Sequence, residues 1–176
     1  IDLADEYGFD GIELLLYQVG QNEMLSRSRM MSYKRRAQRL GLPLMGLSTH
    51  QGFVTPDKDK RQRNIELTIQ QIQTAHSLGI PTMRVNTGRW GTTRSFNQLM
   101  ADQGIEPRLE GYTDEDAFGW VIDALETLVE SAEKYGVVLG LENHWGLGRT
   151  ARGVIKIVKA VSSPWLQITF DTGNFF

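Results

Sequence analysis

Residues 141–146, Leu-Glu-Asn-His-Trp-Gly, and residues 170–175, Phe-Asp-Thr-Gly-Asn-Phe, each end a hydrophobic, strand-like segment with a carboxylate. The two carboxylates, Glu142 and Asp171, are separated by one connection of the length of a helix. Strands joined in this way lie side by side in a parallel sheet, and their carboxyl ends share one edge. We therefore predict that both carboxylates meet there, near His144, and form half of a divalent-metal site.

The composition is that of an ordinary globular domain. Hydrophobic residues make up 40% of the 176 residues and charged residues 23%, which predicts a single domain over residues 1–176. A net charge of −2 and a pI near 5.9 provide no concentrated basic surface for nucleic acids or anionic membranes. We therefore expect a small-molecule substrate, no nucleic-acid or membrane partner, and leave a homo-oligomer open.

Cysteine is absent, so any metal must be held by carboxylate, imidazole or water ligands. These ligands match Mn²⁺, Mg²⁺, Co²⁺ or Zn²⁺, and we expect one such ion as the cofactor. We find no apolar run long enough to span a bilayer and no signal peptide, which favours a cytoplasmic location. Because the chain begins with Ile1 and not with Met, we expect its natural N-terminus to be missing.

Strand-like and helix-like patterns alternate along the whole chain, which is typical of an α/β protein with a parallel sheet. A glycine that ends the third helix and a Thr113–Asp116 capping pair that begins the fourth mark two helix boundaries. The long segment 87–112 is predicted to be a lid or binding loop. The predicted strands are residues 11–16, 44–50, 82–86, 137–142 and 167–171, and the predicted helices are residues 1–7, 24–40, 58–78, 114–135 and 151–161.

The two sides of the predicted strands differ in polarity. Alternate residues face opposite sides of a sheet, and one side is small or polar, with Glu13, Arg84, Gly140 and Glu142 among its members. Such an asymmetry favours a barrel with a polar mouth over an open sheet that is apolar on both faces. We therefore predict a (β/α)8 TIM barrel of which this chain contains about five strands, truncated at both ends. The residues predicted to face outward, toward the helices, are Met45, Leu47, Met83, Val85, Leu139, Leu141, Ile168 and Phe170.

The segments Gly-Leu-Glu-Asn-His-Trp-Gly (140–146) and Phe-Asp-Thr-Gly-Asn-Phe (170–175) resemble the xylose isomerase-like TIM-barrel superfamily, and most closely its sugar phosphate isomerases and epimerases. Residues 8–14 and 78–85 are similar to two further strands of that family. The resemblance implies that Glu142 and Asp171 are metal ligands, with a His and a Glu from later strands as the remaining two. It also implies that Glu142 is one of two glutamates that act as acid and base beside a carbonyl.

The resemblance implies further residues around the same pocket. His144 follows Glu142 on the inward face and is predicted to be catalytic, either in contact with the substrate or as a second base. Glu13 is predicted to form a structural salt bridge with Arg84. The residues predicted to bind the substrate are His50, Arg84, Asn86, Trp90 and Asn174, the last at a position where relatives often carry His.

Several functions remain open within this superfamily. The leading hypothesis is a metal-dependent isomerase or epimerase of a sugar or sugar phosphate. Its main rival is a lyase, an inosose-type dehydratase or a 3-oxo-glycoside deglycosidase, with His144 as the base. An abasic-site endonuclease is less favoured, because that branch needs more histidines than His50, His76 and His144. A non-catalytic fragment is the last alternative, since two carboxylates alone bind a divalent ion weakly.

Overall fold

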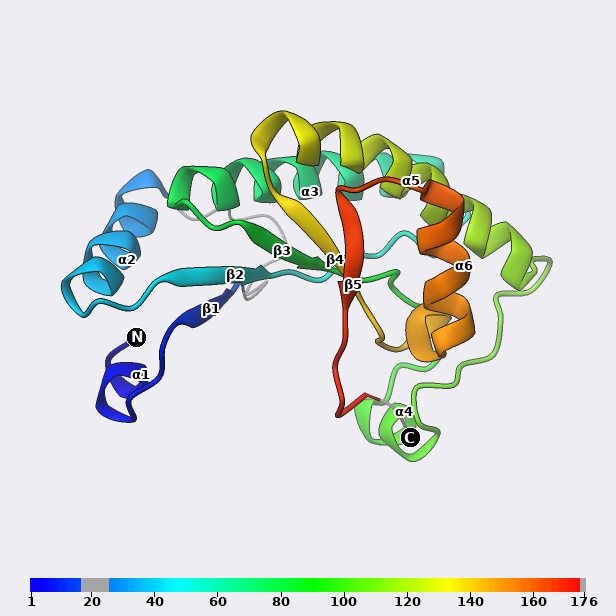
Figure 1. Ribbon diagram of the computed structural model, residues 1–176. Helices are drawn as coiled ribbons and strands as arrows, with labels where there is room; N and C mark the ends of the chain where they lie inside the picture. Colours follow the sequence, from blue (N-terminus) through cyan, green and yellow to red (C-terminus); the bar gives the residue numbers. More distant parts are fainter. Residues whose placement is uncertain (17–25, 175–176) are drawn as a thin grey trace.

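A computed structural model of the chain describes residues 1–16 and 26–174. It contains one parallel sheet whose five strands follow one another in chain order, each paired with the next (Figure 1). This arrangement is that of consecutive strands in a (β/α)8 barrel, so the predicted fold class is confirmed. The strands are β1 (Ile12–Leu15), β2 (Leu44–Ser48), β3 (Thr82–Val85), β4 (Val138–Glu142) and β5 (Leu166–Thr169).

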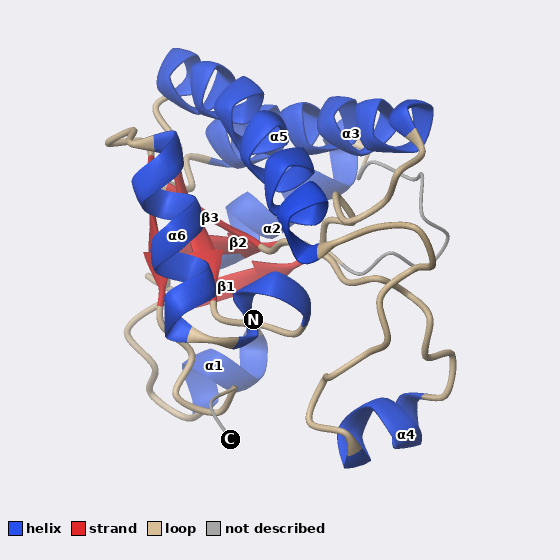
Figure 2. Ribbon diagram, turned by 90° about the vertical axis from the view of Figure 1, so that its right-hand side faces the viewer, coloured by secondary structure: helices blue, strands red, loops and turns tan. Residues whose placement is uncertain are grey.

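Long helices connect the strands, and two of them, α3 and α5, lie together over one face of the sheet (Figure 2). Both end at a glycine in the left-handed conformation, and α5 begins with the predicted capping box between Thr113 and Asp116. The segment 87–112 contains the short helix α4 within its loop. The helices are α1 (Asp2–Glu6), α2 (Arg27–Arg39), α3 (Lys58–Leu78), α4 (Phe96–Ala101), α5 (Asp114–Tyr135) and α6 (Ala151–Val161), with the 3-10 helix η1 (Gly146–Arg149) before α6.

The polarity of the two sheet faces is as predicted for the central strands. Leu47, Met83 and Leu139 point toward the helices and are fully buried in one core with residues of α3, α5 and α6. On the opposite face, Gly140 leaves room for a neighbour, because a side chain there would collide with that of Thr169. The apolar side therefore packs against the helices, and the polar side is the one on which a functional site can form.

Three residues predicted to be buried under helices are instead exposed. Met45 is 58% exposed, and it lies beside Gly11 at the start of the sheet. Ile168 and Phe170 are 48% and 65% exposed. Ile168 lies in β5 and Phe170 directly after it, and β5 is the last strand of the described sheet, where α6 covers one flank and no further described helix covers the other.

All strands but β4, which ends at Glu142 as predicted, are shorter at their carboxyl ends than the sequence predicted. β2 and β3 end at Ser48 and Val85, so His50 and Asn86 lie in the loops that follow. β5 ends at Thr169, which also places Asp171 in a loop. Met24, where the second helix was predicted to begin, lies outside the described residues, and α2 begins at Arg27. The predicted site residues therefore stand at the rim of the sheet, where loops and side chains hold them.

Candidate active site at the carboxyl ends of the strands

Glu142 is the last residue of β4 and its side chain is almost fully buried. Both of its carboxylate oxygens accept hydrogen bonds from Nη1 of Arg84 on β3, at 3.1 and 3.0 Å. Burial raises the pKa of the Glu142 carboxyl above its ordinary value of 4.5, Arg84 opposes this shift, and the neighbouring Asp171 adds to it. Glu142 is thus a carboxylate with an increased affinity for a proton, the property that a general base needs.

Arg84 was predicted to pair with Glu13, and this prediction is wrong. Within the described part of the chain, the ion pair of Arg84 is with Glu142, while Glu13 accepts a hydrogen bond from the Ser48 hydroxyl. The guanidinium of Arg84 also donates from Nη2 to the backbone carbonyl of Thr49 at 3.3 Å. Arg84 therefore fixes the position of Glu142 from the neighbouring strand.

Asn143 holds Asp171 beside Glu142 and is a site residue that the sequence analysis missed. Its side-chain oxygen accepts a hydrogen bond from the Asp171 backbone N–H at 2.7 Å, and its side-chain nitrogen donates to the Asp171 carbonyl at 2.8 Å. We call this pair of bonds the Asn143 clamp. It continues the β4–β5 pairing beyond its last registered pair, Glu142 with Thr169. An amide side chain directly after a rim glutamate is the signal that could have indicated it.

The loop after β5 orients the Asp171 carboxylate through two hydrogen bonds. One oxygen accepts the Gly173 backbone N–H at 2.7 Å, and the other accepts the side-chain amide of Asn174 at 3.0 Å. The structure therefore places Asn174, predicted to contact the substrate, as a hydrogen-bond partner of Asp171. These bonds orient the carboxylate without adding a positive charge beside it.

Two histidines lie next to the carboxylates. The rings of His50 and His144 meet edge to face, with centroids 6.0 Å apart. Burial, and then Arg84 and His144, lower the pKa of His50 from 6.5 to about 4. Burial and Arg84 also lower the pKa of His144, with Asp171 opposing them. Both rings are therefore uncharged near neutral pH, and the Nδ1 atom of His144 accepts the Trp145 backbone N–H at 2.8 Å.

A cavity of about 520 Å³ opens beside these histidines. Asn86 lies on its wall, but its side-chain oxygen accepts the Gln51 backbone N–H at 3.1 Å, so this predicted substrate contact is also a link between two loops. Phe96 and Met100 of α4 contribute apolar side chains to the wall. The lining residues are His50, Gln51, Asn86, Gly88, Arg89, Phe96, Met100, His144 and Trp145.

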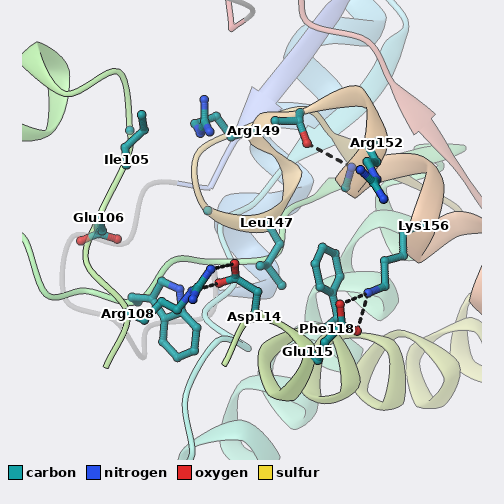
Figure 3. Close-up of a pocket in the computed structure, with 15 residues that line it drawn as sticks. Ile105, Glu106, Arg108, Asp114, Glu115, Phe118, Leu147, Arg149, Arg152 and Lys156 are labelled. Atoms are coloured by element: carbon teal, nitrogen blue, oxygen red, sulfur yellow. Dashed lines mark hydrogen bonds and ion pairs between the residues drawn. The ribbon is translucent and has the colours of Figure 1, made fainter. Parts of the chain in front are cut away.

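Trp90 is the predicted site residue that the structure does not bring to this cluster. Its ring packs edge to face on Trp120 of α5, with centroids 6.1 Å apart, and it lines a second cavity of about 490 Å³ (Figure 3). Charged residues of this second cavity pair with one another, as Arg108 does with Asp114 and Lys156 with Glu115 (Figure 3). Trp90 thus contributes to the packing of the long loop against α5.

Glu142 and Asp171 fit a divalent cation as two of its ligands. Their carboxylates repel each other, which contributes to the raised pKa of Glu142, and a cation between them relieves this repulsion. Oxygen ligands of this kind suit hard divalent ions. Among residues 1–16 and 26–174, no group of three or more His, Asp or Glu side chains is close enough to bind one ion, so further ligands would have to come from elsewhere.

Comparison with known proteins gives the wider context. A family model described as the xylose isomerase-like TIM barrel matches residues 1–176. A D-tagatose 3-epimerase-like protein is similar in structure over 99% of this chain and 60% of its own, with 22% identity and a TM-score of 0.76. The IolI protein with a bound zinc atom is similar over 99% and 57%, with 19% identity and a TM-score of 0.74.

A dehydratase belongs to the same set of similar structures. The probable 3-DHS dehydratase AsbF from Bacillus anthracis is similar over 99% of this chain and 57% of its own, with 15% identity and a TM-score of 0.68. At these identities the likeness establishes the fold. The chain spans between 57% and 60% of the length of these proteins.

Within the described residues, no helix is long and apolar enough to cross a membrane.

Proposed function

Because this chain belongs to the xylose isomerase-like TIM-barrel family, we propose that it provides the catalytic rim of a metal-dependent sugar or sugar phosphate isomerase or epimerase. The observation that carries the proposal is the buried Glu142 carboxylate, whose pKa is raised and which stands beside Asp171 at the carboxyl ends of the strands. Sugar epimerases among the similar structures support the same reaction class.

Glu142 acts in this proposal as the base beside a substrate carbonyl. Its carboxylate takes a proton from the carbon next to the carbonyl, the C–H electrons form a C=C bond, and the carbonyl oxygen becomes negative. Return of a proton to the opposite face of the same carbon gives an epimer. Its return to the former carbonyl carbon gives an isomer, provided that the hydroxyl proton of the neighbouring carbon moves to the former carbonyl oxygen, so that the C=O bond forms again at that neighbouring carbon. Arg84 keeps Glu142 in place by donating to both of its oxygens.

Glu142 and Asp171 are the residues that would hold the divalent ion, with Mn²⁺, Mg²⁺, Co²⁺ and Zn²⁺ as candidates. Such an ion, when bound, polarises the carbonyl and stabilises negative charge on its oxygen. The Asn143 clamp and the two donors to the Asp171 carboxylate keep this second ligand oriented toward the rim. The structure of the IolI protein with a bound zinc atom supports a metal in a protein of this fold.

A lyase is the second candidate, as an inosose-type dehydratase or a 3-oxo-glycoside deglycosidase. It is favoured by His144, an uncharged imidazole that lines the cavity and interacts with the charge of Asp171. The first step is the same loss of a proton, after which the negative charge expels a leaving group from the neighbouring carbon. A dehydratase among the similar structures supports this alternative.

The experiment starts from protein purified without chelator, with its metal content measured by mass spectrometry. The protein is then incubated in D2O with D-fructose, D-tagatose, D-psicose and a 3-keto-D-glucoside, and NMR follows deuterium uptake and products. Epimers or isomers support the main proposal, and an eliminated product supports the lyase. We expect Glu142→Gln to abolish deuterium uptake, whereas Glu126→Gln, on the exposed side of α5, keeps it.

The outcomes separate the alternatives. Wild-type exchange that survives in Glu142→Gln contradicts the role of Glu142 as the base. Absence of both stoichiometric metal and exchange contradicts the enzyme proposal and favours a non-catalytic role. Asp171→Asn should reduce the metal content, because it removes one of the two anionic ligands beside the clamp.

A further inference from the structure

The ring of His144 is held by a hydrogen bond from the next residue of its own chain. The backbone N–H of Trp145 donates to Nδ1 of His144 over 2.8 Å. Only a ring nitrogen without a proton can accept this bond, and a neutral imidazole then carries its single proton on Nε2. The local backbone therefore selects one tautomer of His144, with Nε2–H as its donor.

The Nε2 atom of His144 has no hydrogen-bond partner among the described residues. His144 lines the cavity of about 520 Å³. Within residues 1–16 and 26–174, the hydrogen bond from Trp145 is the one hydrogen bond of the His144 ring. The ring packs edge to face on His50 and on Trp145, with centroids 6.0 and 5.4 Å away. These contacts fix the plane of the ring and leave Nε2 without a protein acceptor in the described structure.

We propose that His144 donates a hydrogen bond from Nε2 to the substrate oxygen that becomes negative, and that it does not act as the base. This inference rests on the proposed function. When Glu142 removes the proton, the new charge is on the former carbonyl oxygen, and a positioned N–H donor stabilises it without a transfer of the proton. A neutral imidazole is suited to this electrophilic role in enediolate chemistry.

A base role for His144 conflicts with the same hydrogen bond. The lone pair that could accept a substrate proton is on Nδ1, and the Trp145 N–H occupies it. To free Nε2 as an acceptor, the proton would have to move to Nδ1, where it would face the Trp145 N–H and abolish the bond. In the lyase alternative, the same Nε2–H stabilises the enolate oxygen before the leaving group departs.

The first test reads the tautomer directly and needs no substrate. Protein labelled with ¹⁵N-histidine contains His50, His76 and His144, and long-range ¹H–¹⁵N correlation spectra at neutral pH distinguish the Nε2–H, Nδ1–H and doubly protonated rings. His144→Gln removes one set of signals and thereby assigns them. The Nε2–H pattern for His144 is the expected result, and an Nδ1–H or doubly protonated ring overturns the proposal.

The second test compares two substitutions by deuterium exchange with the ketohexose probes. His144→Gln keeps an N–H donor but cannot accept a proton as a base, whereas His144→Phe keeps the ring shape and has no donor. We expect Gln to retain exchange within about 10-fold of wild type and Phe to lose about 100-fold. Equal, large losses in both variants overturn the donor role.

His76→Gln, on α3, is the matched control and should exchange like the wild type, and circular dichroism checks that each variant is folded. If the wild-type protein exchanges none of the probes, the proposed function fails. The tautomer spectra still decide the state of His144 in that case, so failure of the function and failure of this inference are distinguishable.

Discussion

Asn143→Ala removes the Asn143 clamp and tests whether this side chain positions Asp171. The clamp consists of two hydrogen bonds of 2.7 and 2.8 Å between one buried amide and the backbone of Asp171. Each bond contributes about 1 kcal/mol net to stability, and the unpaired backbone groups add a cost because water reaches the half-buried Asp171 only in part. We therefore expect the free energy of unfolding to fall by about 2–3 kcal/mol.

Loss of the clamp should also weaken metal binding. A residue that orients a ligand typically changes metal affinity by about 10- to 100-fold, and we expect a loss of this size for Mn²⁺ measured by titration calorimetry. Urea unfolding measures the stability change. Asn97→Ala, at an exposed position of α4, is the control and should change neither quantity appreciably. An Asn143→Ala protein that binds Mn²⁺ as tightly as the wild type would refute the positioning argument, whatever its stability.

The remaining predictions concern stability. Thr113→Ala removes the α5 capping box and should lower the free energy of unfolding by about 1 kcal/mol in urea. Gly146→Ala should cost at least about 2 kcal/mol in the same assay, because Gly146 has a φ of 82° and a Cβ there would collide with the Gly88 carbonyl. Gly119→Ala, inside α5 with open space around it, should instead stabilise by up to about 1 kcal/mol. The pKa of His50 falls from 6.5 to about 4 on folding, so the unfolded chain binds more protons than the folded chain between these two pH values. The free energy of unfolding should therefore rise from pH 4 to pH 6.5. A pH dependence of the free energy of unfolding that is unchanged in His50→Gln would contradict this.

Local patterns made most of the fold predictable from the sequence. Leu139 and Leu141 alternate with Gly140 and Glu142, and this period of two indicated both the strand and the side that faces the helices. The capping box of α5 was visible because its two partners are three residues apart. Properties of this kind depend on residues close in sequence, so no knowledge of the tertiary structure was needed.

The partner of Arg84 could not be predicted in the same way, because it depends on the register between strands. Glu13, Arg84 and Glu142 all belong to the polar face. Glu13 is level with Gly46, whereas Arg84 is level with Ser48, two residues further toward the carboxyl edge. On the other neighbouring strand, β4, Arg84 is level with Gly140. Glu142 is two residues further toward the carboxyl edge on that strand, and it is the acid that Arg84 pairs with.

Strand register and loop structure also explain why the contacts of Asn143 and Trp90 could not be predicted from the sequence. The Asn143 clamp exists because β4 and β5 end at the same level, with Glu142 beside Thr169, so that Asn143, one residue further on, can reach Asp171, two residues further on. Trp90 belongs to the long segment 87–112, whose path over α5 no local pattern predicts. Its length indicated a lid or binding loop, yet its tryptophan packs on Trp120 of α5.

The charges at the rim support proton removal next to a carbonyl. Arg84 supplies one positive charge, and Glu142 and Asp171 supply two negative charges, while burial keeps both nearby histidines uncharged. These residues together carry one net negative charge before proton transfer and none after Glu142 has taken the proton, so on their own they offer the enediolate no net positive charge. A divalent ion held by both carboxylates would bring the net charge to +1. Transfer of the substrate proton to Glu142 leaves this total unchanged, and it places the negative enediolate beside residues and an ion that together would carry +2. A neutral Nε2–H donor at His144 suits this balance, because it stabilises the oxygen without adding a charge that would repel the cation.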